Sequence, residues 1–196
     1  QLFTENTVTA VLPVMHNPTL GNVGLLMRLW SVVLAGNLIG TAVAAWAFNY
    51  MPVFDEPTRQ AFVSIAEDVM KNSPTEMFAN AIISGWLVAT MVWMFPLAGA
   101  AKIVVIILMT WLIALADTTH IVVGSVEILY LVFNGSLPWS DFIWPFALPT
   151  LAGNICGGTF IFALLSHAQI RNDMSSKRKA EARAQAAEKG KKADRA

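Results

Sequence analysis

The side chain best placed to do chemistry is His120, which interrupts a long apolar stretch. It follows the polar run 117–119, and apolar segments 102–115 and 121–133 flank the interruption. An ionisable group in such surroundings usually faces a cavity or a bundle interior, and a broken membrane helix is tolerated only beside protein or water. Because a histidine changes charge near about pH 6.5, His120 beside a pore could attract an anion or pass it a proton. The alternative is a structural histidine hydrogen-bonded to the threonines beside it.

A second candidate site lies at the start of the sequence. Thr4, followed by Glu5, is a candidate helix N-cap whose hydroxyl is free to hold a pore histidine or a permeant ion. Leu2 and Phe3 beside it are candidates for an apolar constriction. An ordinary cap with packing residues is the alternative.

Other polar residues give weaker signals. Lys102 begins an apolar segment and can extend its ammonium to the membrane interface. Asp117 and Glu127 are isolated acids to which the sequence assigns no role. Cys156 is expected to be a small buried filler. Metal-ligand spacing, a phosphate-binding loop and a nucleophile triad are all missing from the sequence, so we expect no catalytic residue, metal or cofactor.

The composition places these residues in a membrane protein. Of 196 residues, 56% are hydrophobic and only 13% are charged, about half of the usual 25%. Charge-free runs of 26, 25 and 29 residues cover 29–54, 77–101 and 142–170, and a membrane helix needs about 20. A soluble enzyme, a nucleic-acid binder with a basic body and a secreted disulfide scaffold are excluded. We predict an all-α, multi-pass membrane protein.

The apolar pattern predicts a series of spans, with a short interfacial helix over 57–70. The spans are expected at 23–51, at 76–95 with an end at Pro96, at 102–115 with a broken continuation at 121–133, and at 142–170. Residues 1–16 are too few to cross. We therefore divide the chain into a membrane domain, 1–170, and a tail, 171–196.

Basic residues set the expected orientation. The tail holds nine Lys or Arg and four Asp or Glu, so the positive-inside rule predicts a cytoplasmic C-terminus. Counting back, 52–74 lies outside and Arg28 begins its span on the cytoplasmic side. The tail has no apolar stripe and is expected to be a solvated or weakly helical extension, with no nucleic-acid partner.

A repeat is the most informative pattern. The segment 34–40, LAGNLIG, recurs 117 residues later as LAGNICG at 151–157. The two copies run in opposite directions across the membrane, which is typical of an inverted repeat. Symmetry then makes 1–16 the second piece of a broken helix matching 121–133. About one and a half spans of a six-span protein would precede Gln1.

Each repeat element contains small residues and an amide: Gly36, Asn37 and Gly40, then Gly153, Asn154 and Gly157. Small residues at this spacing let helices pack closely in lipid. The amides at membrane depth need partners, and we expect carbonyls of neighbouring helices. We predict that these residues build the fold and do not set selectivity.

Together these features resemble the formate/nitrite transporter family. The resemblance rests on Leu2-Phe3-Thr4, the two GN elements, Lys102 with His120 eighteen positions later, and the tryptophan-bearing segment 86–94. It covers essentially 1–170. The family is similar to aquaporins in outline: two inverted halves, two broken helices and one pore in each protomer of a homopentamer. It conducts small monovalent anions such as formate, nitrite or hydrosulfide across the bacterial inner membrane.

The resemblance also implies roles for individual residues. His120 becomes the central pore histidine, hydrogen-bonded toward Thr4, with Leu2 and Phe3 in the cytoplasmic-side constriction. Lys71 corresponds to a lysine expected in the outer vestibule.

The chain departs from the family pattern near the pore. Gly85 stands where the family usually has Asn before Trp86. Thr119 replaces an acid before His120, and Val123-Gly124 replaces an Ala-Asn pair after it. The permeant therefore stays open.

Two other functions stay open as well. One is a neutral-solute channel, although the sequence has Asn17-Pro18-Thr19 in place of the two Asn-Pro-Ala motifs of aquaporins. The other is a degenerate family member with a structural or regulatory role, whose basic tail binds a cytoplasmic partner or anionic lipid.

Overall fold

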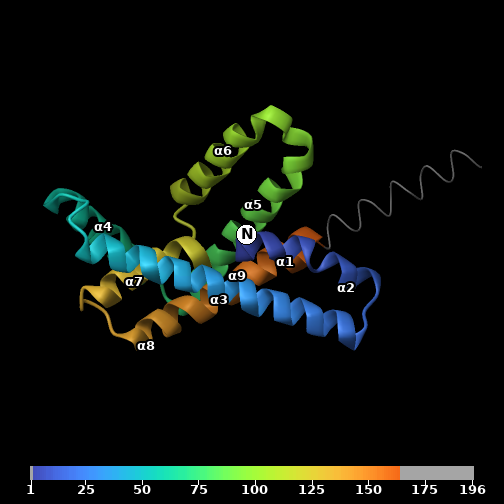
Figure 1. The fold of residues 1–196 in the computed structure, drawn as a ribbon, viewed down its shortest axis with the longest axis horizontal. Coiled ribbons are helices and arrows are strands. Elements are labelled where there is room, and N and C mark those ends of the chain that lie inside the picture. The colour runs from blue at the N-terminus through green and yellow to red at the C-terminus, as the bar shows by residue number, and fades with distance from the viewer. Residues whose placement is uncertain (1, 164–196) are drawn as a thin grey trace, which may run out of the picture.

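A computed structural model describes residues 2–163, and all the regular structure in this range is helical (Figure 1). The elements are α1 (Phe3–Thr9), α2 (Leu12–His16), α3 (Leu20–Tyr50), α4 (Glu56–Met70), α5 (Pro74–Ala98), the short turn η1 (Gly99–Ala101), α6 (Lys102–Leu115), α7 (Ile121–Phe133), α8 (Trp139–Asp141), η2 (Phe142–Ala147), α9 (Leu148–Ile155) and η3 (Cys156–Ala163). The expected tail, 171–196, lies outside the described residues.

The longer helices begin at residues that cap them. Thr19 accepts a backbone hydrogen bond at the start of α3, and Asp55 accepts one of 3.1 Å from Thr58 at the start of α4. The hydrogen bonds from Thr58 lower the pKa of Asp55. Ser73 and Glu76 form a reciprocal capping box at the start of α5. The helices predicted over 23–51 and 57–70 are confirmed.

Helices α5 and α6 form a hairpin, seen as the green arch in Figure 1. The prediction that α5 ends at Pro96 is wrong, because the helix continues to Ala98. A proline removes only one backbone donor. The chain reverses at Gly99, whose φ of +48° is a backbone conformation that glycine adopts easily.

The break predicted before His120 is confirmed. α6 ends at Leu115 and α7 begins at Ile121, as the apolar pattern indicated. No residue of α6 is buried, and Ile103 is 69% exposed. Two stretches among residues 2–163 are long and apolar enough to cross a bilayer: Leu20–Tyr50, and Pro74–Leu115 when α5, η1 and α6 are taken together. Apolar surface on a helix like α6 suits contact with lipid.

The last span is less regular than expected. One helix was predicted over 142–170, but the chain kinks at Trp144, where φ is −138° and ψ is 122°. Helical structure then resumes through α9 and η3 to Ala163. The first segment is also divided, since α1 and α2 are separate helices and not the single piece predicted for 1–16.

The second repeat element packs closely against α5. A Cβ atom on Gly153 would overlap the carbonyl oxygen of Phe78, and one on Gly157 would overlap that of Ile82. This is the close backbone approach expected of small residues in a membrane helix. For Gly36 and Gly40, a Cβ atom would meet nothing within 4 Å among the described residues. The two elements are therefore alike in sequence but not in what they contact here.

Candidate functional site

Helices α1 and α7 meet at their first turns. Thr4 Oγ1 lies 2.7 Å from His120 Nε2, and the two residues are 0% and 4% exposed. They are 116 positions apart in the chain. The structure thus brings together two of the candidate site residues, as the family resemblance implied.

The backbone fixes how the His120 ring hydrogen-bonds. His120 is the N-cap of α7, and its Nδ1 accepts from the backbone N–H groups of Val122 at 3.3 Å and Val123 at 3.4 Å. With Nδ1 accepting, the proton of a neutral ring is on Nε2, which then donates to Thr4 Oγ1. The Thr4 hydroxyl keeps its own proton for donation. The pair is a neutral, buried hydrogen-bonding site.

The break before His120 is clamped to α5 through Thr119. Thr119 Oγ1 donates to the carbonyl of Met77 at 2.7 Å, and Ser84 Oγ donates to the carbonyl of Thr119 at 2.5 Å. Both side chains are buried. Sequence reasoning missed Ser84, since no local pattern relates it to a residue 35 positions away. The clamp holds the backbone on one side of the histidine.

Two asparagines hold the starts of the short helices. Asn154 Oδ1 accepts from the backbone N–H of Ile121 at 2.9 Å, and Asn37 Oδ1 accepts from that of Phe3 at 2.8 Å. Asn154 also donates from Nδ2 to the carbonyl of Ala81 at 2.9 Å and to Ser84 Oγ at 3.0 Å. The sequence led us to expect carbonyl partners, which describes Asn154 only in part. In both cases the amide oxygen serves as a helix cap supplied by another span.

This arrangement corrects the prediction that Thr4 is an N-cap. Leu2 occupies the cap position of α1, and no side chain of its own caps the helix. Thr4 lies in the first turn with its hydroxyl directed to His120. Asn37 accepts from the backbone N–H of Phe3, the first residue of α1.

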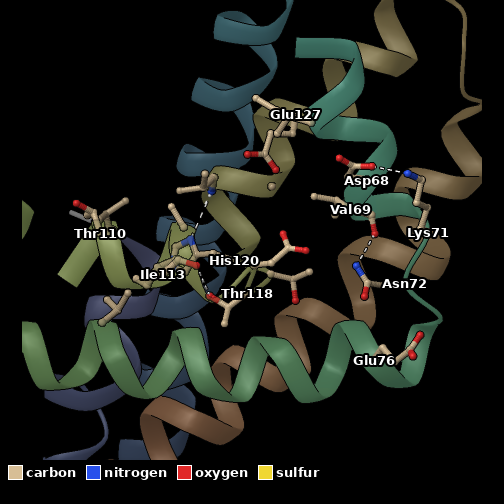
Figure 2. A pocket seen from close by; sticks show the side chains of 18 of the residues that line it. Asp68, Val69, Lys71, Asn72, Glu76, Thr110, Ile113, Thr118, His120 and Glu127 are labelled. Atoms are coloured by element: carbon tan, nitrogen blue, oxygen red, sulfur yellow. Dashed lines mark hydrogen bonds and ion pairs between the residues drawn. The ribbon is translucent and has the colours of Figure 1, made fainter. Parts of the chain in front are cut away.

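A cavity of about 860 Å³ opens beside His120. Figure 2 shows His120 near the middle of the view, with Glu127 and Asp68 higher and Glu76 lower in it. The charged or titratable residues of the lining are Asp68, Lys71, Glu76, Asp117, His120 and Glu127. Asp117 and Glu127, to which the sequence assigned no role, thus share a cavity with the candidate histidine.

The other predicted site residues are divided between cavity and core. Leu2 lines the cavity and is 40% exposed. Phe3 is 1% exposed and packs edge-on against Trp30, with ring centroids 5.9 Å apart. Lys71 lines the cavity, but its Nζ is 2.5 Å from Asp68 Oδ1. That hydrogen bond raises the pKa of Lys71.

Steric contacts explain why Gly85 and Gly124 stand where the family pattern usually has asparagine. A Cβ atom at Gly85 would lie 2.5 Å from the backbone oxygen of Asn154, and one at Gly124 would lie 2.8 Å from the ring of Phe146. Neither position has room for the asparagine that the family usually carries. Within residues 2–163, no group of three or more His, Cys, Asp or Glu side chains is arranged to hold a metal ion.

Comparison with known proteins agrees with the family resemblance seen in the sequence. A family model described as formate/nitrite transporter matches residues 1–168, and the chain belongs to the formate/nitrite transporter family. Among known proteins it is 84% identical over 186 residues to inner membrane protein YfdC of Escherichia coli (strain K12), covering 95% of this chain and 60% of that protein. It is 28% identical over 142 residues to uncharacterized transporter YrhG of Bacillus subtilis (strain 168), covering 69% and 52%. The chain thus spans little more than half the length of these relatives.

Proposed function

We propose that this chain forms much of a channel or transporter for small monovalent anions of weak acids, such as formate or nitrite, in a bacterial inner membrane. The observation that carries the proposal is the 2.7 Å contact of Thr4 with His120, a residue that lines a cavity. Membership of the formate/nitrite transporter family supports the class of protein. The name of the 84% identical relative supports the membrane.

We also infer an aquaporin-like inverted repeat with one pore per protomer. The sequence repeat supports it, as does the equivalent use of Asn37 and Asn154 to cap the helices that start at Phe3 and Ile121. By family resemblance we propose a homopentamer. Positive charge in 171–196 favours a cytoplasmic C-terminus.

His120 and Thr4 would act at the narrowest polar point of the pathway. A neutral imidazole donating to a hydroxyl offers hydrogen bonds to a small permeant without a fixed charge of its own. Leu2 and Phe3 would supply the apolar surroundings, and Lys71 would lie in the outer vestibule. Specificity among weak acids would depend on the size of the cavity and its charges.

Flux through the full-length protein in proteoliposomes tests the proposal. Formate, nitrite, hydrosulfide and acetate are compared, with glycerol as the neutral control, for the wild type, His120→Asn and Thr4→Val. The two variants should lower uptake by about tenfold, the effect of losing one buried hydrogen bond. His16→Asn is the matched control, because His16 is exposed at the end of α2.

If the folded oligomer takes up none of these solutes, the transport proposal is contradicted. That result would favour a structural or regulatory role, which deletion of 171–196 would then probe. Uptake of glycerol alone would favour a neutral-solute channel.

A further inference from the structure

A second cavity lies where the ends of α3 and α7 meet the first half of α4 (Figure 1). Its volume is about 480 Å³, and its lining includes Asn49 and Tyr50 of α3, Glu56 and Arg59 of α4, and Tyr130 of α7. It is distinct from the cavity beside the histidine, since no residue lines both. The transport site described above therefore does not account for it.

The length of α3 places this cavity at the depth of lipid headgroups. α3 has 31 residues, which correspond to about 46 Å along a helix, whereas a bilayer is about 40–45 Å thick with its headgroups. The last turn of α3, which carries Tyr50, therefore lies in the headgroup region. Trp46 and Tyr50 are 50% and 59% exposed, with ring centroids 5.7 Å apart. Exposed aromatic side chains of this kind form the belts at membrane interfaces.

Two opposite charges line the cavity without being paired to each other. Arg59 donates to three backbone carbonyls between positions 49 and 54, at 2.8, 2.9 and 3.3 Å. These acceptors are uncharged and a guanidinium has five N–H groups, so its charge is unmatched and two N–H groups are left. Glu56 accepts a 3.3 Å hydrogen bond from Gln60. Within residues 2–163, no ion pair includes Glu56 or Arg59.

Hydrogen bonds between distant segments hold the walls of the cavity in place. Asn49 Nδ2 donates to the carbonyl of Tyr130 at 3.1 Å, and the Tyr50 hydroxyl donates to that of Phe133 at 2.7 Å. These two bonds join the last turns of α3 and α7, and the bonds of Arg59 join α4 to the end of α3. A site that is formed in advance loses little conformational entropy when a ligand binds.

A zwitterionic phospholipid headgroup carries the charges that match this lining. Its phosphate accepts hydrogen bonds from a guanidinium, and its ammonium pairs with a carboxylate. Glu56 and Arg59 are three positions apart on α4, so their Cβ atoms are about 5–6 Å apart on one face. A phosphate and an ammonium joined by two carbons can contact both side chains at once.

The surroundings of the cavity suit a lipid better than a soluble zwitterion such as an amino acid. Met51 and Val53, in the turn between α3 and α4, are 47% and 64% exposed. Together with Trp46 and Tyr50 they put apolar surface next to the charged lining. The glycerol and acyl parts of a lipid can cover such surface, whereas a soluble zwitterion has no apolar part to place there.

We propose that this cavity binds the headgroup of a zwitterionic phospholipid, with the phosphate on Arg59 and the ammonium on Glu56. An ethanolamine headgroup fits, because its primary ammonium can donate hydrogen bonds to the carboxylate. The lipid belongs to the outer leaflet in the orientation that the positive-inside rule predicts. Bound there, it links α3, α4 and α7. The proposal does not depend on the transport function.

Native mass spectrometry of the full-length protein in detergent measures the binding. Phosphatidylethanolamine is compared with phosphatidylglycerol of the same acyl chains, and the water-soluble phosphoethanolamine is added as a competitor. The variants are Glu56→Gln and Arg59→Lys. Glu67→Gln is the matched control, because Glu67 is exposed on α4 but outside the lining of the cavity.

The wild type should bind phosphatidylethanolamine more tightly than phosphatidylglycerol. Glu56→Gln should weaken phosphatidylethanolamine binding about threefold, the effect of losing one exposed ion pair, without weakening phosphatidylglycerol binding. Arg59→Lys should weaken the binding of both lipids, because both have the phosphate and lysine lacks the planar fork. Glu67→Gln should change neither. The melting temperature of each variant without lipid reports on its folding.

Equal affinity of the wild type for the two lipids would overturn the proposal, as would an unchanged preference in Glu56→Gln. The second test does not require Arg59, which also holds the end of α3 and is needed for its structure. Competition by phosphoethanolamine as strong as by the whole lipid would overturn the proposal too, because the cavity would then be a site for a soluble solute.

Discussion

Asn154 closes the broken helix around His120 by accepting the backbone N–H of Ile121 at 2.9 Å, while its amide nitrogen binds Ala81 and Ser84 of α5. One fully buried side chain therefore joins α5, α7 and α9. We expect Asn154→Leu to destabilise the protein by about 1–3 kcal/mol, because it leaves buried donors and acceptors unpaired. Thermal unfolding in detergent, compared with Asn17→Leu at an exposed position, measures this; equal melting temperatures would contradict it.

The Ser84 clamp should affect transport more than stability. Ser84→Ala removes a hydroxyl that contacts Thr119 and Asn154 with little change in volume. We expect uptake to fall severalfold, because the backbone before His120 is then less constrained. Ser64→Ala, an exposed substitution on α4, is the control.

A fall in uptake of Ser84→Ala indicates a positioning role for Ser84 only if the variant remains folded. Oligomer elution and melting temperature of Ser84→Ala should stay close to those of the wild type. Recovery of uptake by Ser84→Thr, which restores a hydroxyl, would support the clamp. Full activity of Ser84→Ala would refute it.

The glycines of the two repeat elements should respond differently to substitution. Gly153→Ala and Gly157→Ala force a methyl group into the backbone of α5 and should cost about 1–3 kcal/mol of stability. Gly36→Ala and Gly40→Ala meet nothing within 4 Å among the described residues and should be tolerated. Melting temperatures of the four variants decide the matter. An equal loss at Gly36 would instead indicate a segment outside 2–163 packed against it.

Release of Lys71 should make the cavity more attractive to anions. Asp68→Asn removes the partner 2.5 Å from the Lys71 ammonium and should raise formate uptake about threefold at low ionic strength. The pKa of Lys71 should fall toward its ordinary value, since the hydrogen bond that Lys71 donates to Asp68 raises it. The gain should disappear at high salt and in a Lys71→Met background. A gain that persists in that background would show that Lys71 is not its cause.

Sequence pattern was most informative where apolar periodicity and polar breaks coincide. The limits of α6 and α7 follow from apolar segments ending at a polar run, and the pairing of Thr4 with His120 followed from family resemblance. The prediction that α5 ends at Pro96 failed because a proline near a helix end removes only one backbone hydrogen-bond donor. The chain reverses instead at Gly99, which has a positive φ.

Contacts between distant segments could not be read from local pattern. Threonine is a common N-cap residue, but Leu2 occupies the cap position of α1, and the backbone N–H of Phe3 is bound by Asn37, which lies 34 residues later in the chain. The Ser84–Thr119 bond spans 35 residues and involves a carbonyl, which every residue possesses. That Asp117 and Glu127 line the same cavity is likewise seen only in the structure.

The asparagine caps also bear on the order in which the protein is made. Phe3 receives its cap from a residue 34 positions later, and Ile121 from one 33 positions later. A ribosome synthesises and releases the chain from its N-terminus, so each short helix enters the membrane before its cap exists. The starts of α1 and α7 must then wait for α3 and α9 to be inserted before they can adopt their final form. The final form of α1 and of α7 is thus coupled to insertion of a later helix.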